Sequence, residues 1–215
     1  MTDATYFTTR LPPDPRRRTL WTTLVRYYFP RWMAPTDVVL DLGCGHADFI
    51  NAVTARRRIA VDTRPDLLDI LAPGVEGHVG SMADLSFLEK SSVDVVLASN
   101  VFEHVSHETL SRTLTEVRRI LTTSGRLVIL QPNYYYCYRR YFDDYTHVTV
   151  YSHVSLCDAL RAERYEILEC SPRFLPLSIK SRLPITPGLI RLYLASPWKP
   201  LAGQMLVVCR PGRSH

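Results

Sequence analysis

Apolar positions in the middle of the chain follow two alternating patterns, short unbroken runs and stripes with helical spacing. The runs Val38–Leu42 and Val93–Ser99 predict buried strands. Weaker runs predict five more strands, at 58–61, 78–82, 126–130, 166–170 and 205–209. Helical spacing predicts helices at 46–53, 65–71, 110–121 and 152–164, and Gly125 is interpreted as the stop after the third of them.

Strands that alternate with helices over short connections predict an α/β fold. We expect an open sheet of seven strands, mostly parallel, with helices on both faces. The last two predicted strands have no convincing helix between them, so the final strand is expected to close the sheet in the antiparallel direction. The proline-rich residues 171–203 between these strands are interpreted as an insertion.

The region before the first strand has a different character. Residues 1–36 are rich in proline, arginine and aromatic residues, and Trp21, Leu24, Val25 and Tyr28 have helical spacing. We therefore expect an N-terminal arm with one amphipathic helix that ends near Pro30. The rest of the chain, residues 37–215, is predicted to form one domain.

Composition and charge narrow the class of protein. The 215 residues carry a net charge of +5, but the basic residues are scattered and no nucleic-acid recognition motif accompanies them, so a nucleic-acid partner is not favoured. The five cysteines are irregularly spaced without a Cys-x-x-Cys pair, which favours a reducing, cytoplasmic setting over a disulfide framework. No apolar run approaches the roughly 18–20 residues that span a bilayer, and a signal-peptide pattern is not apparent.

The loop after the first strand is the most informative segment. Gly43 and Gly45 allow the backbone to turn sharply and to approach a ligand closely. The second strand ends at Asp62, where a carboxylate can accept hydrogen bonds from two ribose hydroxyls. Dinucleotide sites usually have a third glycine, but Asp48 stands at that position, and Asp41 suits the ammonium group of a methionine moiety.

Several segments in order resemble the motifs of class I S-adenosylmethionine-dependent methyltransferases, of the methyltransferase type 11 kind. The segment 38–45 is similar to the first motif, 60–62 to the acidic motif, 80–87 to the adenine-side loop, 93–105 to the fourth-strand motif and 125–133 to the fifth. The resemblance covers roughly residues 37–170 and part of the end. It implies a Rossmann-like fold and S-adenosylmethionine as the cofactor.

The resemblance also implies a role for each matching position. Gly43 and Gly45 would line the methionine part, Asp41 would lie near its amino group, and Asp62 would hold the ribose. The remaining matches are Ser81 and Met82 beside the adenine and Asn100 and Val101 near the sulfonium. Ser81 departs from the family, which often has aspartate there.

The acceptor side is predicted from two polar segments. Glu103 and His104 follow the fourth strand, and His147 follows the fifth, so all three are expected at the same edge of the sheet. Histidine can take a proton near neutral pH, which makes His104, His147 and Glu103 the candidate catalytic residues. They also resemble the metal-binding set of some O-methyltransferases, but Asn100 replaces the first glutamate of that set, and no metal ligand is assigned. A structural role for His104 is the alternative.

The acceptor itself is less defined. We expect O-methylation of a small molecule, with a sugar-containing or secondary-metabolite acceptor. Three alternatives remain open. The first is RNA methylation, in which the tyrosines and arginines of 134–142 would form a loop that stacks on bases. The others are a non-catalytic module and an NAD-dependent oxidoreductase. The 171–203 segment, with apolar residues at 189–194, would cap the acceptor, form a dimer face or contact a membrane peripherally. Monomer and homodimer both stay open.

Overall fold

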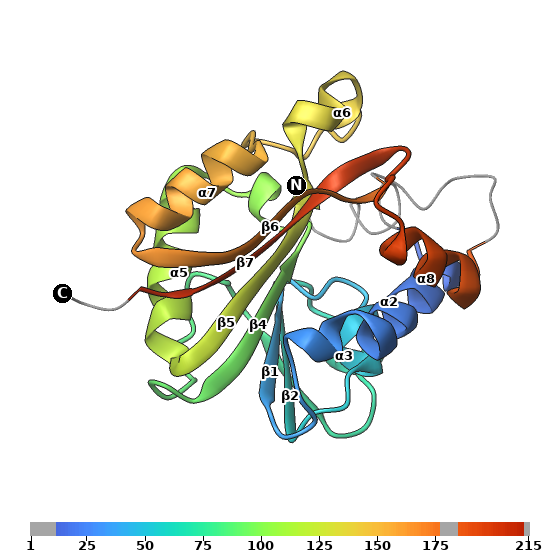
Figure 1. Ribbon diagram of the computed structural model, residues 1–215. Helices are drawn as coiled ribbons and strands as arrows, with labels where there is room; N and C mark the ends of the chain where they lie inside the picture. Colours follow the sequence, from blue (N-terminus) through green and yellow to red (C-terminus); the bar gives the residue numbers. More distant parts are fainter. Residues whose placement is uncertain (1–11, 177–184, 213–215) are drawn as a thin grey trace.

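A seven-stranded sheet forms the centre of the molecule (Figure 1). The computed structural model describes residues 12–176 and 185–212. The strands follow the order β3-β2-β1-β4-β5-β7-β6. They are β1 (Val38–Leu42), β2 (Arg57–Asp62), β3 (Val75–Val79), β4 (Val93–Ser99), β5 (Leu121–Pro132), β6 (Tyr165–Pro176) and β7 (Ala202–Pro211).

The direction of the strands places the candidate site. Strands β1 to β5 pair in parallel, and β7 runs antiparallel between β5 and β6. The predicted α/β class and the antiparallel closing strand are therefore confirmed. The order of strands reverses at β1, between β2 and β4, and ligands of open α/β sheets bind beyond the carboxyl ends of strands at such a point.

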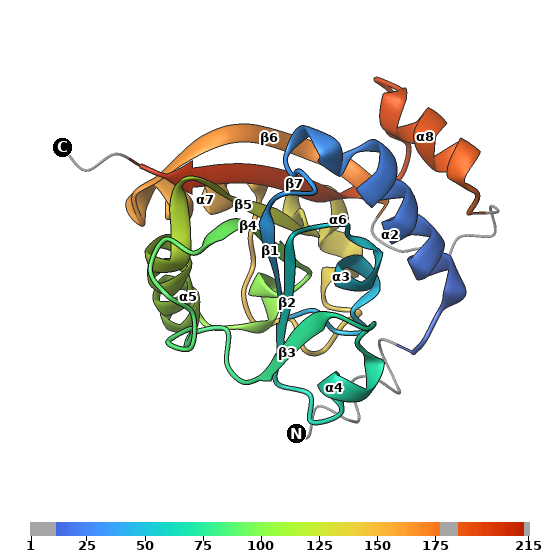
Figure 2. The same ribbon diagram turned by 90° about the horizontal axis from the view of Figure 1, so that it is seen from below.

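Helices cover both faces of the sheet (Figure 2). They are α2 (Pro15–Tyr27), η1 (Phe29–Arg31), α3 (Asp48–Ala52), α4 (Leu67–Ile70), η2 (Phe102–His104), α5 (His107–Ile120), α6 (Tyr134–Tyr141), α7 (His153–Ala162) and α8 (Pro187–Ala195). Buried residues of α5 and α7 share one core cluster with the sheet, and those of α2, α3 and α4 share the other. Within the described residues, no helix is both long and apolar enough to cross a membrane.

Three expected boundaries of strands and helices were wrong. The third strand is Val75–Val79 and not 78–82, because the chain turns at Gly74 with φ +78° and pairs with β2 from Val75. The helix expected to continue to Leu121 ends at Ile120, since Leu121 adopts an extended backbone and begins β5. The helix expected to end near Pro30 ends at Tyr27, and a separate 3₁₀ turn follows.

Three further corrections concern the segments rich in proline and tyrosine. Strand β6 continues to Pro176, so the expected insertion begins later than residue 171. A helix, α8, does lie between the last two strands, with Thr186 as its N-cap and Pro187 at its first position, where proline needs no hydrogen-bond partner. Residues 177–184 of the expected insertion lie outside the described residues. The expected tyrosine loop is the helix α6.

The N-terminal helix α2 packs into the hydrophobic core of the domain. Trp21 and Leu24 of α2 are buried in the same cluster as Phe49 of α3, and the Trp21 and Phe49 rings lie 5.4 Å apart. Because burying such side chains removes apolar surface from water, α2 contributes to the stability of the whole domain.

We expect Leu24→Ala to lower the free energy of unfolding of the entire domain. Leu24 is fully buried, and removing such a side chain typically costs about 2–5 kcal/mol. Urea unfolding followed by tryptophan fluorescence and circular dichroism should shift as one transition. The exposed neighbour Thr22 provides the control, and Thr22→Ala should change stability by less than about 1 kcal/mol. A separate early transition for α2 would contradict this account.

Candidate cofactor and acceptor site

The turn after β1 requires glycine at Gly43. Its φ is +71°, in the left-handed region, and a Cβ there would lie 2.4 Å from Cγ2 of Val101. Gly45 also has a positive φ, of 56°. Any larger residue at Gly43 would collide with the side chain that follows β4, so the turn brings the ends of β1 and β4 into direct contact.

Asp62 fastens this turn from the end of β2. Its Oδ2 accepts a hydrogen bond from the Gly45 N–H at 2.7 Å, and its Oδ1 accepts one from the Arg64 N–H at 3.0 Å. The half-buried carboxylate therefore orders the loop between β1 and α3.

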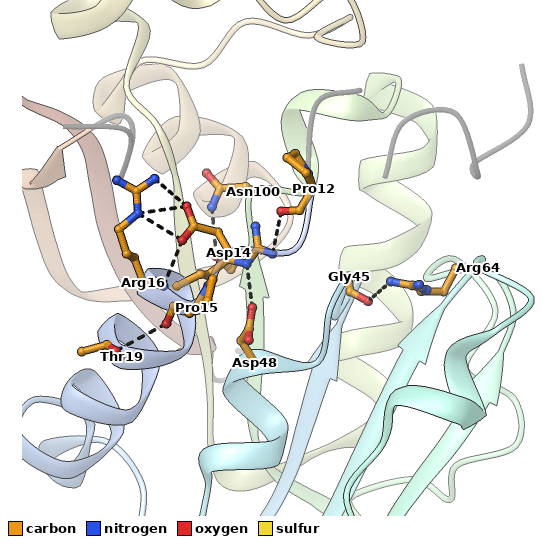
Figure 3. A network of polar contacts seen from close by, with 11 residues as sticks. Pro12, Asp14, Pro15, Arg16, Thr19, Gly45, Asp48, Arg64 and Asn100 are labelled. Carbon is orange, nitrogen blue, oxygen red and sulfur yellow. Dashed lines mark hydrogen bonds and ion pairs between the residues drawn. The ribbon is translucent and has the colours of Figure 1, made fainter. Parts of the chain in front are cut away.

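Arg64 also stabilises this loop, a role that the sequence did not predict. Its guanidinium donates to the Gly45 carbonyl at 2.8 Å, as Figure 3 shows. The same group pairs with both oxygens of Asp66, at 2.7 and 2.6 Å. The turn is thus held from its N–H side by Asp62 and from its carbonyl side by Arg64.

Asp41 lies beneath the turn and is 3% exposed. Burial, followed by the negative charge of Asp62, raises the pKa of its carboxyl well above the ordinary value, although a hydrogen bond from the Ile50 backbone acts in the opposite direction. A buried carboxyl with a raised pKa is stabilised as an anion by a nearby cation. The position therefore suits the ammonium group that the sequence predicts there.

Asp48 is the first residue of α3, as expected of an acid in the first turn of a helix. Its carboxylate accepts a hydrogen bond from Nε of Arg17 at 2.6 Å, and both side chains are largely buried. Figure 3 shows Asp48 facing the start of α2. The N-terminal helix is therefore tied to the loop of the candidate cofactor site.

The predicted adenine-side residues differ in their surroundings. Both lie in the loop after β3, where Met82 packs against the core and Ser81 is exposed. The Ser81 hydroxyl accepts a hydrogen bond from the Ala83 N–H at 3.2 Å, so part of its capacity is used within the loop. Nearby, His78 and Phe87 stack with ring centroids 3.8 Å apart, a contact the sequence did not indicate.

Asn100 and Val101 follow β4 at the carboxyl edge of the sheet. Asn100 has a φ of 53°, and its N–H donates to the Leu130 carbonyl of β5 at 2.7 Å. The Asn100 side-chain oxygen accepts a hydrogen bond from Nε2 of Gln204 at 3.2 Å. These bonds fix the amide between β4, β5 and β7, which directs the next residue, Val101, toward Gly43.

Glu103 is a fully buried carboxyl in η2. In the described residues neither of its oxygens has a hydrogen-bond partner. Burial raises its pKa to about 8, and the negative charge of Asp144 adds to this shift. An unpartnered buried carboxyl is unfavourable by several kcal/mol, which is expected where a ligand completes the site.

His104 and His147 lie beside Glu103, as predicted. Their ring centroids are 4.9 Å apart, and Nε2 of His104 is 3.9 Å from Oε1 of Glu103. Nδ1 of His147 faces the Tyr141 carbonyl at 2.7 Å, and Nδ1 of His104 faces the Thr146 carbonyl at 3.2 Å. Because a carbonyl only accepts, Nδ1 of each ring is the protonated nitrogen that donates to it.

The charge state of His104 follows from its surroundings. Burial, followed by repulsion from His147, lowers its pKa to about 4. The imidazole is therefore neutral at physiological pH. The protonated carboxyl of Glu103 and the neutral imidazole of His104 therefore lie side by side, at the edge of the sheet where β4 ends.

Comparison with known proteins agrees with this geometry. The family model described as a methyltransferase domain matches residues 40–129. An uncharacterized protein of Methanocaldococcus jannaschii is 32% identical over 96 residues, which is 45% of this chain and 41% of that protein. The chain therefore spans about two fifths of the length of this curated relative.

Solved structures share the fold. An S-adenosylmethionine-dependent methyltransferase from Archaeoglobus fulgidus has a TM-score of 0.67 at 19% identity, with 96% of this chain and 98% of that chain covered. The Burkholderia thailandensis 1,6-didemethyltoxoflavin-N1-methyltransferase, with bound S-adenosylhomocysteine, has a TM-score of 0.62 at 16% identity, covering 98% and 86%. Residues 40–129 therefore match a methyltransferase domain, and the chain shares the fold of S-adenosylmethionine-dependent methyltransferases.

The cluster of Glu103, His104 and His147 has the ligand types of a divalent-cation site. One ligand atom from each of Glu103, His104 and His147 can lie within 4.8 Å of the other two. Two imidazoles and a carboxylate are ligands that several divalent metals accept, and metal-bound histidines usually donate their other N–H to a carbonyl, as both do here. The unpartnered oxygens of Glu103 are consistent with this fit.

Three residues near the candidate site were assigned no individual role from the sequence. Thr146 donates to Asp144 at 2.6 Å and lies 3.0 Å from His104, so it helps to set the histidine tautomer. Asn133 caps α6 and joins it to α7 and β6. Gln131 of β5 is fully buried, and its amide has no partner among the described residues. The sequence indicated only that residues 143–147, which include Asp144 and Thr146, lie near the predicted site.

We expect Glu103→Gln to change how the stability of the methyltransferase domain depends on pH. The folded-state pKa of about 8 exceeds the ordinary value of 4.5, so the folded protein keeps a proton that the unfolded chain loses. The stabilisation is complete below about pH 4.5 and is lost as the pH rises toward 8. The variant should therefore gain stability relative to the wild type over this range, by up to a few kcal/mol.

Urea unfolding from pH 5 to pH 8 in metal-free buffer measures this difference. Glu108→Gln, at an exposed position of α5, is the matched control and should follow the wild-type curve. Parallel curves for Glu103→Gln and the wild type would contradict the buried, protonated carboxyl.

Proposed function

We propose that the chain transfers a methyl group from S-adenosylmethionine to a hydroxyl oxygen of a small molecule. The single observation that supports this most is the contact between Gly43 and Val101. It joins the loop fastened by Asp62 to the segment that carries Glu103 and His104. The cofactor side and the acceptor side are thereby adjacent at one edge of the sheet.

On the cofactor side, the proposed roles follow the side-chain chemistry. Asp62 accepts hydrogen bonds from the ribose hydroxyls, and Asp41 stabilises the ammonium group of the methionine moiety. Gly43 and Gly45 leave room for the methionine chain. Met82 and the Ser81 loop flank the adenine, and Asn100 with Val101 borders the sulfonium.

On the acceptor side, methyl transfer needs an in-line approach and a place for one proton. The acceptor oxygen forms a bond to the methyl carbon while the bond from that carbon to sulfur breaks, which leaves neutral S-adenosylhomocysteine. The hydroxyl proton passes to Nε2 of His104 or His147, which is the lone-pair nitrogen of a ring held at Nδ1. Positioning by the cluster supplies much of the rate.

We propose methylation of an oxygen and not of a nitrogen because a histidine base is available to take the proton of a hydroxyl. A hydroxyl must lose its proton as the methyl group transfers, whereas a neutral amine already offers a lone pair. If a divalent cation is bound by Glu103, His104 and His147, it would lower the pKa of a hydroxyl that coordinates it. Exposed Tyr135 and Tyr138 of α6, near the same edge of the sheet, favour an acceptor with a ring that can stack.

Binding of S-adenosylhomocysteine tests the cofactor side. We expect calorimetry to show binding in the micromolar range and a large loss of affinity for Asp62→Ala, because the ribose contact and the Gly45 fastening both disappear. Since an ammonium group favours the anion of Asp41, affinity should rise with pH and binding should release a proton. Asp41→Asn should remove the proton release, which titrations in buffers of different ionisation enthalpy measure.

Asp158→Asn is the matched control, because Asp158 is exposed on α7 and pairs with Arg161 of the same helix. Its effect on cofactor affinity should be small. Absence of any binding at high micromolar cofactor concentration would contradict the proposed function.

Substitution of the histidines tests the acceptor side. A screen of hydroxyl-bearing small molecules with radiolabelled methyl donor supplies the acceptor. His104→Ala and His147→Ala should then each lower turnover by about 10²–10⁴-fold, the usual range for a positioned base, while cofactor affinity stays near the wild-type value. His153→Ala, on α7 and bonded to Asn133, is the histidine control for a general loss of packing.

A chelator distinguishes the metal-free cluster of Glu103, His104 and His147 from the cluster with a bound divalent cation. Turnover that survives EDTA supports imidazole as the base, and turnover that is lost and then restored by a divalent cation supports the metal form. Unchanged rates in both histidine variants would remove the cluster from the mechanism.

A further inference from the structure

The surface formed by α8 and the turn after it exposes large apolar side chains. Leu192 is 68% exposed, Trp198 75% and Leu201 78%, and Leu189 is also exposed. Figure 1 shows α8 at the edge of the molecule, away from the sheet. We name Leu189, Leu192, Trp198 and Leu201 the α8 surface. Exposed apolar groups gathered in this way commonly mark a site of interaction.

The α8 surface is held in place by ordered backbone. The Ser196 hydroxyl accepts from the Trp198 N–H at 3.1 Å and donates to the Trp198 carbonyl at 2.9 Å. Nζ of Lys199 donates to the Leu194 carbonyl at 2.8 Å and so satisfies the end of α8. Leu201 has a φ of 57°, an unfavourable conformation for leucine, and this turn displays its side chain to solvent.

Basic side chains surround the α8 surface. The Arg191 guanidinium lies 4.3 Å from the ring centroid of Tyr27, and that of Arg26 lies 5.3 Å from the same ring, which joins α8 to α2. Arg173 donates to the Lys199 carbonyl at 3.0 Å. Residues 15–36 and 185–212 contain no aspartate or glutamate. In the described part of the chain, ion pairs involve none of Arg26, Arg173, Arg191 and Lys199.

We propose that the α8 surface binds peripherally to a bilayer that contains anionic lipids. Leu192, Trp198 and Leu201 enter the boundary between headgroups and acyl chains, where tryptophan is favoured. Arg26, Arg173 and Arg191 face the lipid phosphates, and the segments 15–36 and 185–212 contribute no acidic side chain that would oppose them.

The chemistry favours a lipid surface over a protein partner. Interfacial helices combine leucine and tryptophan with basic residues that anionic headgroups neutralise, and in the described part of the chain none of Arg26, Arg173 and Arg191 is in an ion pair. The nine residues of α8 are too few to span the bilayer, so contact is limited to its surface. The inference is independent of the methyl acceptor.

Sedimentation with vesicles tests this proposal on the full chain. We expect binding to vesicles of phosphatidylcholine with phosphatidylglycerol, weak binding to phosphatidylcholine alone, and loss of binding as salt rises from about 0.1 to 1 M. The double variant Leu192→Ser/Trp198→Ser should lower the partition coefficient by about tenfold or more. Arg26→Gln/Arg191→Gln should weaken binding to anionic vesicles and leave the salt-insensitive part unchanged.

Leu68→Ser is the matched control, because Leu68 is 62% exposed on α4, which lies away from α8 in Figure 2. It should bind vesicles as the wild type does. Thermal unfolding checks that all variants are folded, as expected from the exposure of the substituted side chains. Absence of binding to anionic vesicles, equal binding by the α8 variants, or concentration-dependent dimerisation abolished by Leu192→Ser/Trp198→Ser without vesicle binding would overturn the proposal.

Discussion

The hydrogen bond from the Gly45 N–H to Asp62 is the interaction on which the candidate site depends. It joins the turn after β1 to the end of β2, while Arg64 holds the carbonyl of the same glycine. The turn can adopt this shape only because Gly43 and Gly45 have positive φ angles and because Gly43 leaves space for Val101. One turn thus fixes the relative positions of three neighbouring strand ends, β2, β1 and β4.

The cluster around Glu103 depends on a different constraint, the burial of polar groups that the described residues leave without hydrogen-bond partners. Glu103 and Gln131 leave side-chain oxygen and nitrogen atoms without partners in the described residues. The two histidines near Glu103 are instead held by backbone carbonyls, which fixes their tautomers before any ligand arrives. A site with oriented bases and unsatisfied buried atoms is prepared for a ligand that completes its hydrogen bonds or coordination.

Much of the fold could be predicted from the sequence, because buried strands and glycine turns have strong local signals. Strand β4 has the bounds that its apolar run predicts. Strand β3 was misplaced because it lies at the sheet edge, where half-exposed residues give no continuous run. Leu121 was assigned to a helix because a buried leucine fits the stripe of α5 and the start of β5 equally well, and periodicity does not separate the two.

The site was predictable only in part. Glu103, His104 and His147 lie together because parallel strands end at one edge, which topology alone indicates. Arg64 and Thr146 act through hydrogen bonds to residues brought near by the fold, and no local pattern encodes such contacts. Helix α8 was missed because prolines on both sides obscure a short helix, although Thr186 followed by Pro187 is itself a start signal.

A crystal structure with S-adenosylhomocysteine bound would test the central claim most directly. The account predicts the ribose hydroxyls at Asp62, the amino group near Asp41, and the sulfur beside Val101 with the vacant methyl position facing His104 and His147. A cofactor bound elsewhere, or a sulfur atom that faces away from these histidines, would contradict it.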